Sequence, residues 1–146
     1  MITKIKLNSD TYYSLWYADK TYRFEMKGDK ILFFNNVKAA LDYANKMQLD
    51  VDEETIEIDC NKAMKKEIDE TEYENLRLFL DAANDMDSCM EYGILNEKYR
   101  QNIFCEIYLK IRNARFKLQL DENEQNAMKE LIESSMDVYR IALQNI

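Results

Sequence analysis

The sequence of 146 residues contains no histidine and no proline, and its two glycines are Gly28 and Gly93. Without histidine, the Ser-His-Asp and Cys-His arrangements of nucleophilic catalysis are excluded, and so is the usual general base near neutral pH. Neither glycine belongs to a G-x-G-x-x-G or G-x-x-x-x-G-K-S/T pattern, so no phosphate-binding loop is indicated. We therefore expect that the chain is not an enzyme.

Cysteine is also scarce. Cys60, Cys89 and Cys105 are odd in number, widely spaced and without a C-x-x-C pair, which indicates neither a disulfide framework nor a zinc site. A partial calcium-loop spacing that begins at Asp85 lacks the glycine that such a loop requires at its sharp turn. We expect no bound metal and no cofactor.

Long apolar runs are missing too. None approaches the roughly 20 residues that cross a bilayer. The first ten residues include lysines between isoleucine and leucine, where a signal peptide would have a continuous apolar stretch. A cytoplasmic location is expected. The composition, 47% hydrophobic and 33% charged, is that of a globular chain.

Apolar and polar residues alternate in the first third of the chain, which predicts half-buried strands. These strands are expected around residues 4–7, 12–18, 21–27 and 30–35. Two-residue connections separate the last three, and the pair Gly28-Asp29 suits a type II′ turn because glycine comes first. The prediction is an antiparallel β-meander.

One helix and a returning strand are expected to complete this N-terminal layer. Asn36 is placed to cap a helix over residues 37–47, in which the apolar residues keep helical spacing. Alternation resumes over residues 55–60, where Ile56 and Ile58 are expected to face the same way.

Helical periodicity replaces alternation from about residue 62 onward. Apolar stripes over residues 76–83, 103–118 and 128–143 predict about three antiparallel helices in a C-terminal bundle. Thr71 with Glu74 and Asp121 with Glu124 have the spacing of capping boxes. The fold class is therefore α+β, with one compact domain over 1–146 that has a sheet layer (1–61) and a helical layer (62–146).

The net charge of −8 is concentrated in the middle of the chain. Residues 42–91 hold 5 Lys and Arg against 16 Asp and Glu, a net charge of −11. Residues 1–41 carry +3 and residues 92–146 are neutral. Such a distribution repels nucleic acids and anionic membranes and attracts a basic partner. The alternative is that these acidic residues only solubilise helix faces and favour the first turns of helices.

We expect the partner to contact acidic residues of this segment together with two tyrosines, a residue type that often anchors interfaces. Three of the acidic residues, Asp81, Asp85 and Asp87, are expected to be exposed. The full set of candidate partner-binding residues is Asp50, Asp52, Glu53, Glu54, Glu57, Asp59, Asp69, Glu70, Tyr73, Asp81, Asp85, Asp87 and Tyr92.

Three segments of the N-terminal third resemble a known class of protein. They are Tyr12-Tyr13-Ser14-Leu15-Trp16-Tyr17, Ile31-Leu32-Phe33-Phe34-Asn35-Asn36 and Ala39-Ala40-Leu41-Asp42-Tyr43-Ala44. In these segments the chain is similar to small cytoplasmic immunity proteins, which neutralise bacterial toxins of polymorphic or contact-dependent growth-inhibition systems. The resemblance implies a non-enzymatic inhibitor that binds a cognate toxin tightly, often a nuclease with a basic substrate cleft.

Two other interpretations share the same sequence features. An acidic inhibitor of a nucleic-acid enzyme, such as a phage-encoded mimic of DNA, would carry the same charge distribution. The third interpretation, after the immunity protein and the acidic inhibitor, is a helical adaptor or homodimer that uses the helix expected over 103–118. Copurification with a basic protein would favour the first two, whereas a concentration-dependent dimer would favour the third. For the immunity protein, we expect a monomer or a weak homodimer.

Overall fold

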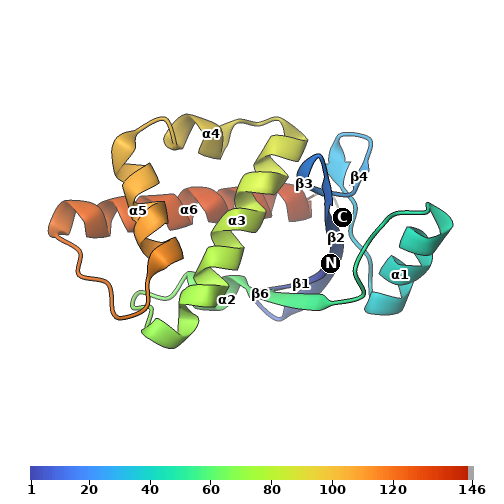
Figure 1. Ribbon diagram of the computed structural model, residues 1–146, viewed down its shortest axis with the longest axis horizontal. Helices are drawn as coiled ribbons and strands as arrows, with labels where there is room; N and C mark the ends of the chain where they lie inside the picture. The colour runs from blue at the N-terminus through green and yellow to red at the C-terminus, as the bar shows by residue number, and fades with distance from the viewer. Residues whose placement is uncertain (145–146) are drawn as a thin grey trace.

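The structure, a computed structural model, describes residues 1–144 and has a mixed α+β fold. Strands β1 to β5 come first in the chain, and β6 follows α1. Helices α2 to α6 make up one half of the molecule, while α1 lies apart at the opposite end (Figure 1). The strands are β1 (Ile2–Leu7), β2 (Asp10–Asp19), β3 (Thr21–Phe24), β4 (Met26–Lys27), β5 (Lys30–Ile31) and β6 (Thr55–Asp59). The helices are α1 (Val37–Lys46), α2 (Cys60–Ala63), the 3₁₀ turn η1 (Glu70–Glu72), α3 (Tyr73–Met90), α4 (Ile94–Lys98), α5 (Asn102–Asn113) and α6 (Glu122–Gln144).

Four strands form one sheet in the order β3-β2-β1-β6. The register places Ile5 opposite Tyr12 of β2 and Ile58 of β6. Because side chains alternate along a strand, Ile5 and Ile58 point together into the core, whereas Lys4 and Lys6 lie on the other face. This alternation confirms the sequence prediction for β1 and β6. β6 is parallel to β1, since the crossover through α1 returns the chain to the same end of the sheet.

The expected meander is shorter than predicted. The strand predicted over 21–27 is interrupted at Glu25, whose buried carboxylate accepts the N–H of Met26 at 3.2 Å. A side-chain acceptor that bonds a neighbouring N–H competes with strand pairing, so β4 and β5 form a separate two-stranded ribbon. Of the strand predicted over 30–35, only β5 and a single bridge from Phe34 to Tyr13 are observed within residues 1–144.

Helix α1 begins as the sequence predicted. The side chain of Asn36 accepts the N–H of Ala39 at 2.8 Å and caps the first turn. The helix packs on the sheet face that carries Ile2 and Leu15, where Ala40 is fully buried. This small cluster holds α1 on the side of the sheet that faces away from the other helices.

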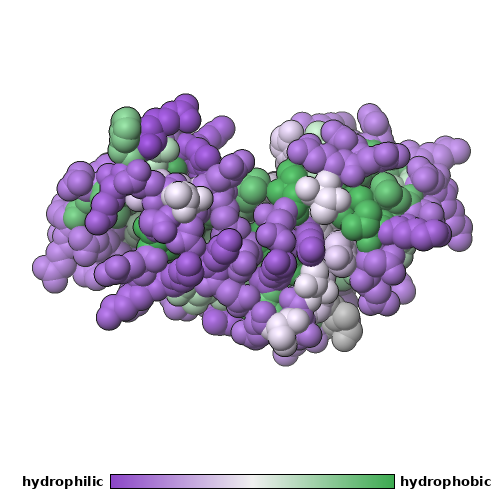
Figure 2. Space-filling view, turned by 90° about the horizontal axis from the view of Figure 1, so that it is seen from below, coloured by the Kyte–Doolittle hydropathy of each residue, from purple (hydrophilic) through white to green (hydrophobic). Residues whose placement is uncertain are grey.

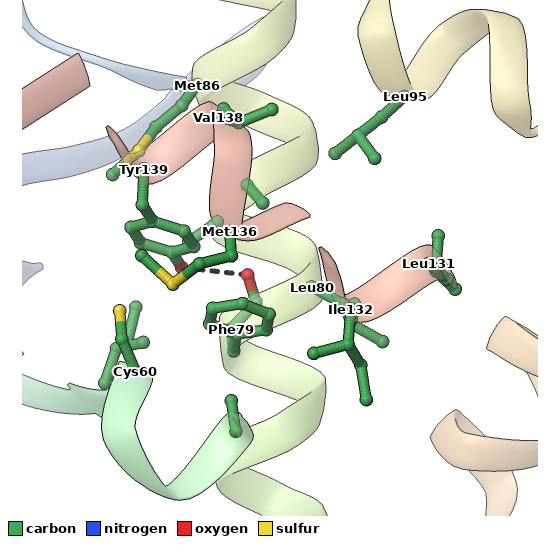
Figure 3. Close-up of a cluster of buried hydrophobic side chains, with 14 of the residues drawn as sticks. Cys60, Phe79, Leu80, Met86, Leu95, Leu131, Ile132, Met136, Val138 and Tyr139 are labelled. Atoms are coloured by element: carbon green, nitrogen blue, oxygen red, sulfur yellow. Dashed lines mark hydrogen bonds between the residues drawn. The ribbon is translucent and has the colours of Figure 1, made fainter. Parts of the chain in front are cut away.

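The main core lies on the other face of the sheet and takes residues from β1, β2, β3 and β6 and from helices α2 to α6. Its centre is the contact between α3 and α6, where the ring of Tyr139 stacks on Phe79 with 4.9 Å between centroids (Figure 3). The buried Tyr139 hydroxyl donates to the Phe79 carbonyl at 2.8 Å. Cys60, Met86 and Met136 surround this pair. The apolar stripes predicted around residues 76–83 and 128–143 therefore form one core with the sheet.

The expected bundle of three antiparallel helices is not confirmed. In Figure 1, α3 and α5 cross α6 steeply, and α4 connects α3 to α5 along one edge. Helix α5 ends at Asn113, although its apolar periodicity continues to Leu118. Beyond it the backbone is extended at Ala114, and the N–H of Leu118 donates to the Tyr73 hydroxyl at 3.0 Å. A tertiary contact therefore takes the place of a longer helix.

The two predicted capping boxes have different outcomes. Asp121 and Glu124 cap α6 reciprocally: the N–H of Glu124 donates to Asp121 at 2.8 Å, and the N–H of Asp121 donates to Glu124 at 3.2 Å. The box predicted for Thr71 and Glu74 is wrong. Asp69 instead caps the 3₁₀ turn by accepting the N–H of Thr71 at 2.9 Å, so the chain is already turning when α3 begins.

The outer edge of β6 is closed at one end by a side chain of α3. The amide group of Asn75 accepts the N–H of Asp59 at 2.8 Å and donates to the Asp59 carbonyl at 2.9 Å. A single side chain thus supplies both hydrogen bonds that a neighbouring strand would make with this residue.

Among residues 1–144, no helix has the length and apolar character needed to cross a membrane.

Candidate functional site

The predicted partner-binding residues do not form one continuous surface. Tyr73 and Asp87 are buried, and Asp59, Asp81 and Asp85 are half-buried. The remaining eight are exposed: Asp50, Asp52, Glu53, Glu54, Glu57, Asp69, Glu70 and Tyr92. The exposed acidic residues between positions 50 and 54 precede β6, near the end of the molecule that carries α1 (Figure 1). Asp69 and Glu70 lie instead beside the start of α3.

The loop before β6 holds the densest group of exposed carboxylates. We call Asp50, Asp52, Glu53 and Glu54 the acidic patch. Within the described chain none of the four forms a salt bridge, although Asp52 accepts the N–H of Glu54 at 3.1 Å. The Met1 ammonium group lies within electrostatic range of Asp52 and Glu54, and its pKa is lowered because burial outweighs the attraction of these two. The patch therefore presents a concentrated negative charge to solvent.

Other acidic residues of the segment have local structural partners. Glu57 lies across from two lysines of β1 and forms a salt bridge with Lys6 at 3.0 Å. Asp59 caps α2 by accepting the N–H of Lys62 at 3.1 Å. An exposed salt bridge such as that between Lys6 and Glu57 contributes little stability, but it reduces the free negative charge of this region.

The expectation that Asp87 is exposed is wrong. Its side chain is 2% exposed, and its two carboxylate oxygens accept the N–H groups of Ile94 at 3.2 Å and Leu95 at 2.9 Å. These are the first N–H groups of α4, which have no partner inside their own helix. Gly93, with φ of +73°, makes the sharp turn that aims them at Asp87. Asp87 is thus a remote cap for α4.

The same expectation is wrong for Asp81 and Asp85, which point from α3 toward other elements. Asp85 accepts the indole N–H of Trp16 at 2.8 Å, and Asp81 accepts the hydroxyl of Tyr108 on α5. Burial raises the pKa of Asp85; the hydrogen bond from Trp16 lowers it in part, and the neighbouring carboxylate of Asp81 raises it. Burial, together with the bond to Asp81, raises the pKa of Tyr108 to about 12.

The two predicted tyrosines differ in the same way. Tyr73 is buried and anchors the loop after α5 through its hydroxyl. Tyr92 is 58% exposed, in the connection between α3 and α4. Tyr92 therefore remains available to a partner, and Tyr73 does not.

A cavity of about 290 Å³ opens between α3 and α5. We call it the α3–α5 pocket. Its lining consists of two polar residues of α3, three residues of α5 and one tyrosine between α4 and α5: Asp81, Asn84, Cys105, Tyr108, Leu109 and Tyr99. Leu109 is 50% exposed and lies at the rim, whereas the other five are half-buried.

Two tyrosine rings dominate one side of this pocket. The rings of Tyr99 and Tyr108 meet edge to face with 5.7 Å between centroids. The Tyr99 hydroxyl is buried without a hydrogen-bond partner in the described chain, and burial raises its pKa strongly. The thiol of Cys105 donates to the Tyr99 carbonyl at 2.8 Å and so holds this tyrosine in place.

The cysteines form no disulfide within residues 1–144. Cys60 is fully buried in the main core, and burial raises the pKa of its thiol to about 12. A thiol with a raised pKa carries little thiolate and is a poor nucleophile. No group of three or more acidic or cysteine side chains in the described residues has the geometry to hold a metal ion.

The sequence did not indicate the α3–α5 pocket. Its residues come from three segments, and Asp81 lies 27 positions before its hydrogen-bond partner Tyr108. The available signal is modest: on α5, Cys105, Tyr108 and Leu109 lie beside the apolar stripe rather than on it, so they form the margin of a packed face.

Figure 2 shows another face of the molecule, largely hydrophilic, on which apolar side chains gather mainly toward the end that carries α1.

Comparisons of this chain with protein-family models, with curated proteins and with solved structures find no match.

Proposed function

We propose that the chain is a binding protein that neutralises a basic protein partner in the cytoplasm, as immunity proteins neutralise toxins. The acidic patch carries this proposal. Its four carboxylates are consecutive or nearly so, exposed, and without a salt bridge in residues 1–144. Exposed like charges held this close repel one another, and a basic partner relieves that repulsion on binding.

Surface area permits such an interface. The described chain exposes 9020 Å². A standard protein interface covers about 800 Å² on each partner, which is less than about a tenth of that area. The acidic patch is a suitable centre, because its four carboxylates lie in an exposed loop and form no salt bridge within the described chain.

The reading frame beside the gene gives the first test. We expect it to encode a protein with a basic, toxic C-terminal domain. That domain, produced together with the chain, should elute with it as one complex and should no longer stop bacterial growth. A neighbouring frame without such a domain, or a chain that neither binds nor protects, would contradict the proposed function.

Charge neutralisation then tests the surface. A variant that combines Asp50→Asn, Asp52→Asn, Glu53→Gln and Glu54→Gln should bind the toxin at least about tenfold more weakly than the parent, since four steering charges are lost. The matched control combines Glu91→Gln, Glu106→Gln, Glu122→Gln and Glu133→Gln, which are also exposed and outside the salt bridges of the described chain. It changes the net charge equally and should bind like the parent. Equal loss in both variants would indicate net charge alone, not the patch.

A second candidate function is a homodimer or adaptor that uses the region of α5. It is favoured by two large apolar side chains, Leu109 at 50% exposure and Phe116 at 80% exposure, near one another in the chain. This candidate requires the two side chains to form one contiguous apolar patch, since such patches mark interaction sites whereas single exposed apolar residues do not. Sedimentation of the chain alone, over a range of concentrations, would show a dimer that Phe116→Ser weakens.

A further inference from the structure

The α3–α5 pocket combines apolar walls with an acidic group. Leu109 and the two tyrosine rings supply the apolar part, and Asp81 and Asn84 supply the polar part from α3. Asp85, one turn along α3 from Asp81, does not line the pocket and accepts the Trp16 N–H, but its carboxylate lies within electrostatic range of Asp81 and Tyr108. Within residues 1–144 neither carboxylate forms a salt bridge.

Two arginines lie near this pocket without forming a salt bridge to Asp81 within residues 1–144. Arg77 is one turn before Asp81, but its guanidinium donates to the Arg112 carbonyl at 2.9 Å, toward the end of α5. Arg112 lies close enough to lower the pKa of Tyr108 slightly, against the larger raising effects of burial and of Asp81. Asp81 accepts one hydrogen bond, from Tyr108, and a carboxylate has acceptor sites for several more.

The size and shape of the pocket select the kind of occupant. A cavity of about 290 Å³ is too large for one water molecule, whose share of liquid volume is about 30 Å³. A purely apolar side chain would fill it but would cover the Asp81 carboxylate without offering a hydrogen bond, which is costly. Lysine and arginine have an alkyl stem that suits the apolar walls and a cationic head that suits the carboxylate. Their heads are also attracted to the faces of tyrosine rings.

We propose that the α3–α5 pocket receives one lysine or arginine side chain of the protein partner. The cationic head pairs with Asp81, while the alkyl stem lies against Tyr108 and Leu109. The proposal rests on the proposed function only in that the cation belongs to a protein partner. The acidic patch and the pocket are separate places on the molecule, so the partner would be held at two points.

Small probes test the pocket without the partner. The ¹⁵N-labelled full chain is titrated with N-acetyl-arginine amide and N-acetyl-lysine amide, and amide resonances are followed. We expect saturable shifts in α3 and α5 around Asp81 and Tyr108. Citrulline amide has the shape of arginine without its charge, and norleucine amide has only the alkyl stem; both, N-acetylated, should bind at least about tenfold more weakly.

Two variants identify the group that recognises the cation. Asp81→Asn keeps an oxygen for the Tyr108 hydroxyl and removes the charge, so it should weaken binding of both cationic probes by at least about tenfold. Leu109→Lys, at the exposed rim, places a competing ammonium group at the mouth and should have the same effect if Asp81→Asn fails to fold. Glu133→Gln is the charge-matched control on α6 and should bind the probes like the parent.

Three results would overturn the proposal: citrulline amide binding as well as arginine amide, norleucine amide binding best, or probe shifts that appear mainly at the acidic patch. These results leave the proposed function intact, because partner binding through the patch is measured separately. Conversely, probes that bind as expected in a chain that protects against no toxin would overturn the proposed function and leave a cation pocket.

Discussion

The indole N–H of Trp16 donates a 2.8 Å hydrogen bond to the carboxylate of Asp85, across 69 positions of sequence. This bond joins β2 to α3 at a place where Trp16 is 5% exposed and also stacks on Phe24. Asp85, a residue of the acidic segment, therefore connects the sheet to the helices. Burial makes this carboxylate costly to ionise and so raises its pKa.

Replacement of Asp85 by asparagine should leave the free energy of unfolding at neutral pH unchanged or higher. The asparagine oxygen still accepts the Trp16 N–H, and the cost of a half-buried charge disappears. In the parent, the folded pKa of Asp85 lies above the unfolded value of 3.8, so the folded state binds this proton more tightly. The parent should therefore gain stability relative to the variant as pH falls through the folded pKa toward 3.8, and lose it again as pH rises.

Urea unfolding of both proteins at neutral and mildly acidic pH measures this difference. Asp85→Ala is the control, since it leaves the buried Trp16 N–H without an acceptor and should cost about 1–3 kcal/mol at either pH. If acidification instead lowers the free energy of unfolding of the parent relative to that of Asp85→Asn, the direction given for this pKa is wrong.

Replacement of Asp87 by alanine should lower the free energy of unfolding by about 1–3 kcal/mol, because two N–H groups at the start of α4 lose their acceptors. Asp87→Asn keeps one acceptor oxygen and should fall between the parent and Asp87→Ala. Chemical denaturation gives both values. Ser88→Ala, at the exposed neighbouring position on α3, is the control and should be within about 0.5 kcal/mol of the parent. An Asp87→Ala protein as stable as the parent would show that α4 needs no remote cap.

The contact between Tyr139 and Phe79 gives a third prediction. Tyr139→Phe removes only the hydroxyl that donates to the Phe79 carbonyl and should cost about 0.5–1.5 kcal/mol. Tyr139→Ala also removes the stacked ring and should cost about 3–5 kcal/mol, which threatens folding of a chain this size. Thermal and urea unfolding measure both. Equal losses for the two variants would mean that the hydroxyl, not the ring, holds α6 to α3.

Association with the proposed basic partner should depend strongly on salt. Exposed charges act over the Debye length, which shrinks from about 10 Å at 0.1 M salt to about 3 Å at 1 M. The association rate should therefore fall steeply with added salt while the dissociation rate changes less. Stopped-flow mixing of the partner with the parent, and separately with the patch variant, measures the association rate at each salt concentration. The rate of the variant should depend less steeply on salt. Identical slopes would place the steering charges elsewhere.

Local signals were sufficient for the parts of the fold that depend on near neighbours. The cap at Asn36 and the reciprocal cap of Asp121 and Glu124 involve residues three positions apart, and both were predicted from spacing. The alternation in β1 and the apolar stripe of α3 follow from burial of one face. These features are encoded in short stretches, so a single sequence reveals them.

Features that depend on distant partners could not be predicted in this way. The periodicity of α5 continues past Asn113, but Tyr73 bonds the backbone of Leu118 and the helix ends earlier. The charge count of the middle segment was correct, yet it could not separate Asp50, which faces solvent, from Asp87, which caps a helix. The same limit hid the α3–α5 pocket, because its walls meet only after α3 and α5 pack.

Asn75 has a consequence for how this chain behaves at high concentration. Edge strands invite pairing with strands of other molecules, and this is a common start of aggregation. Because Asn75 already occupies the N–H and carbonyl of Asp59, a foreign strand laid along β6 must stop short of that residue. With β6 only five residues long and Glu57 exposed at its middle, a foreign strand finds few residues to pair with along this edge. Asn75 thus limits self-association through the β6 edge of the sheet.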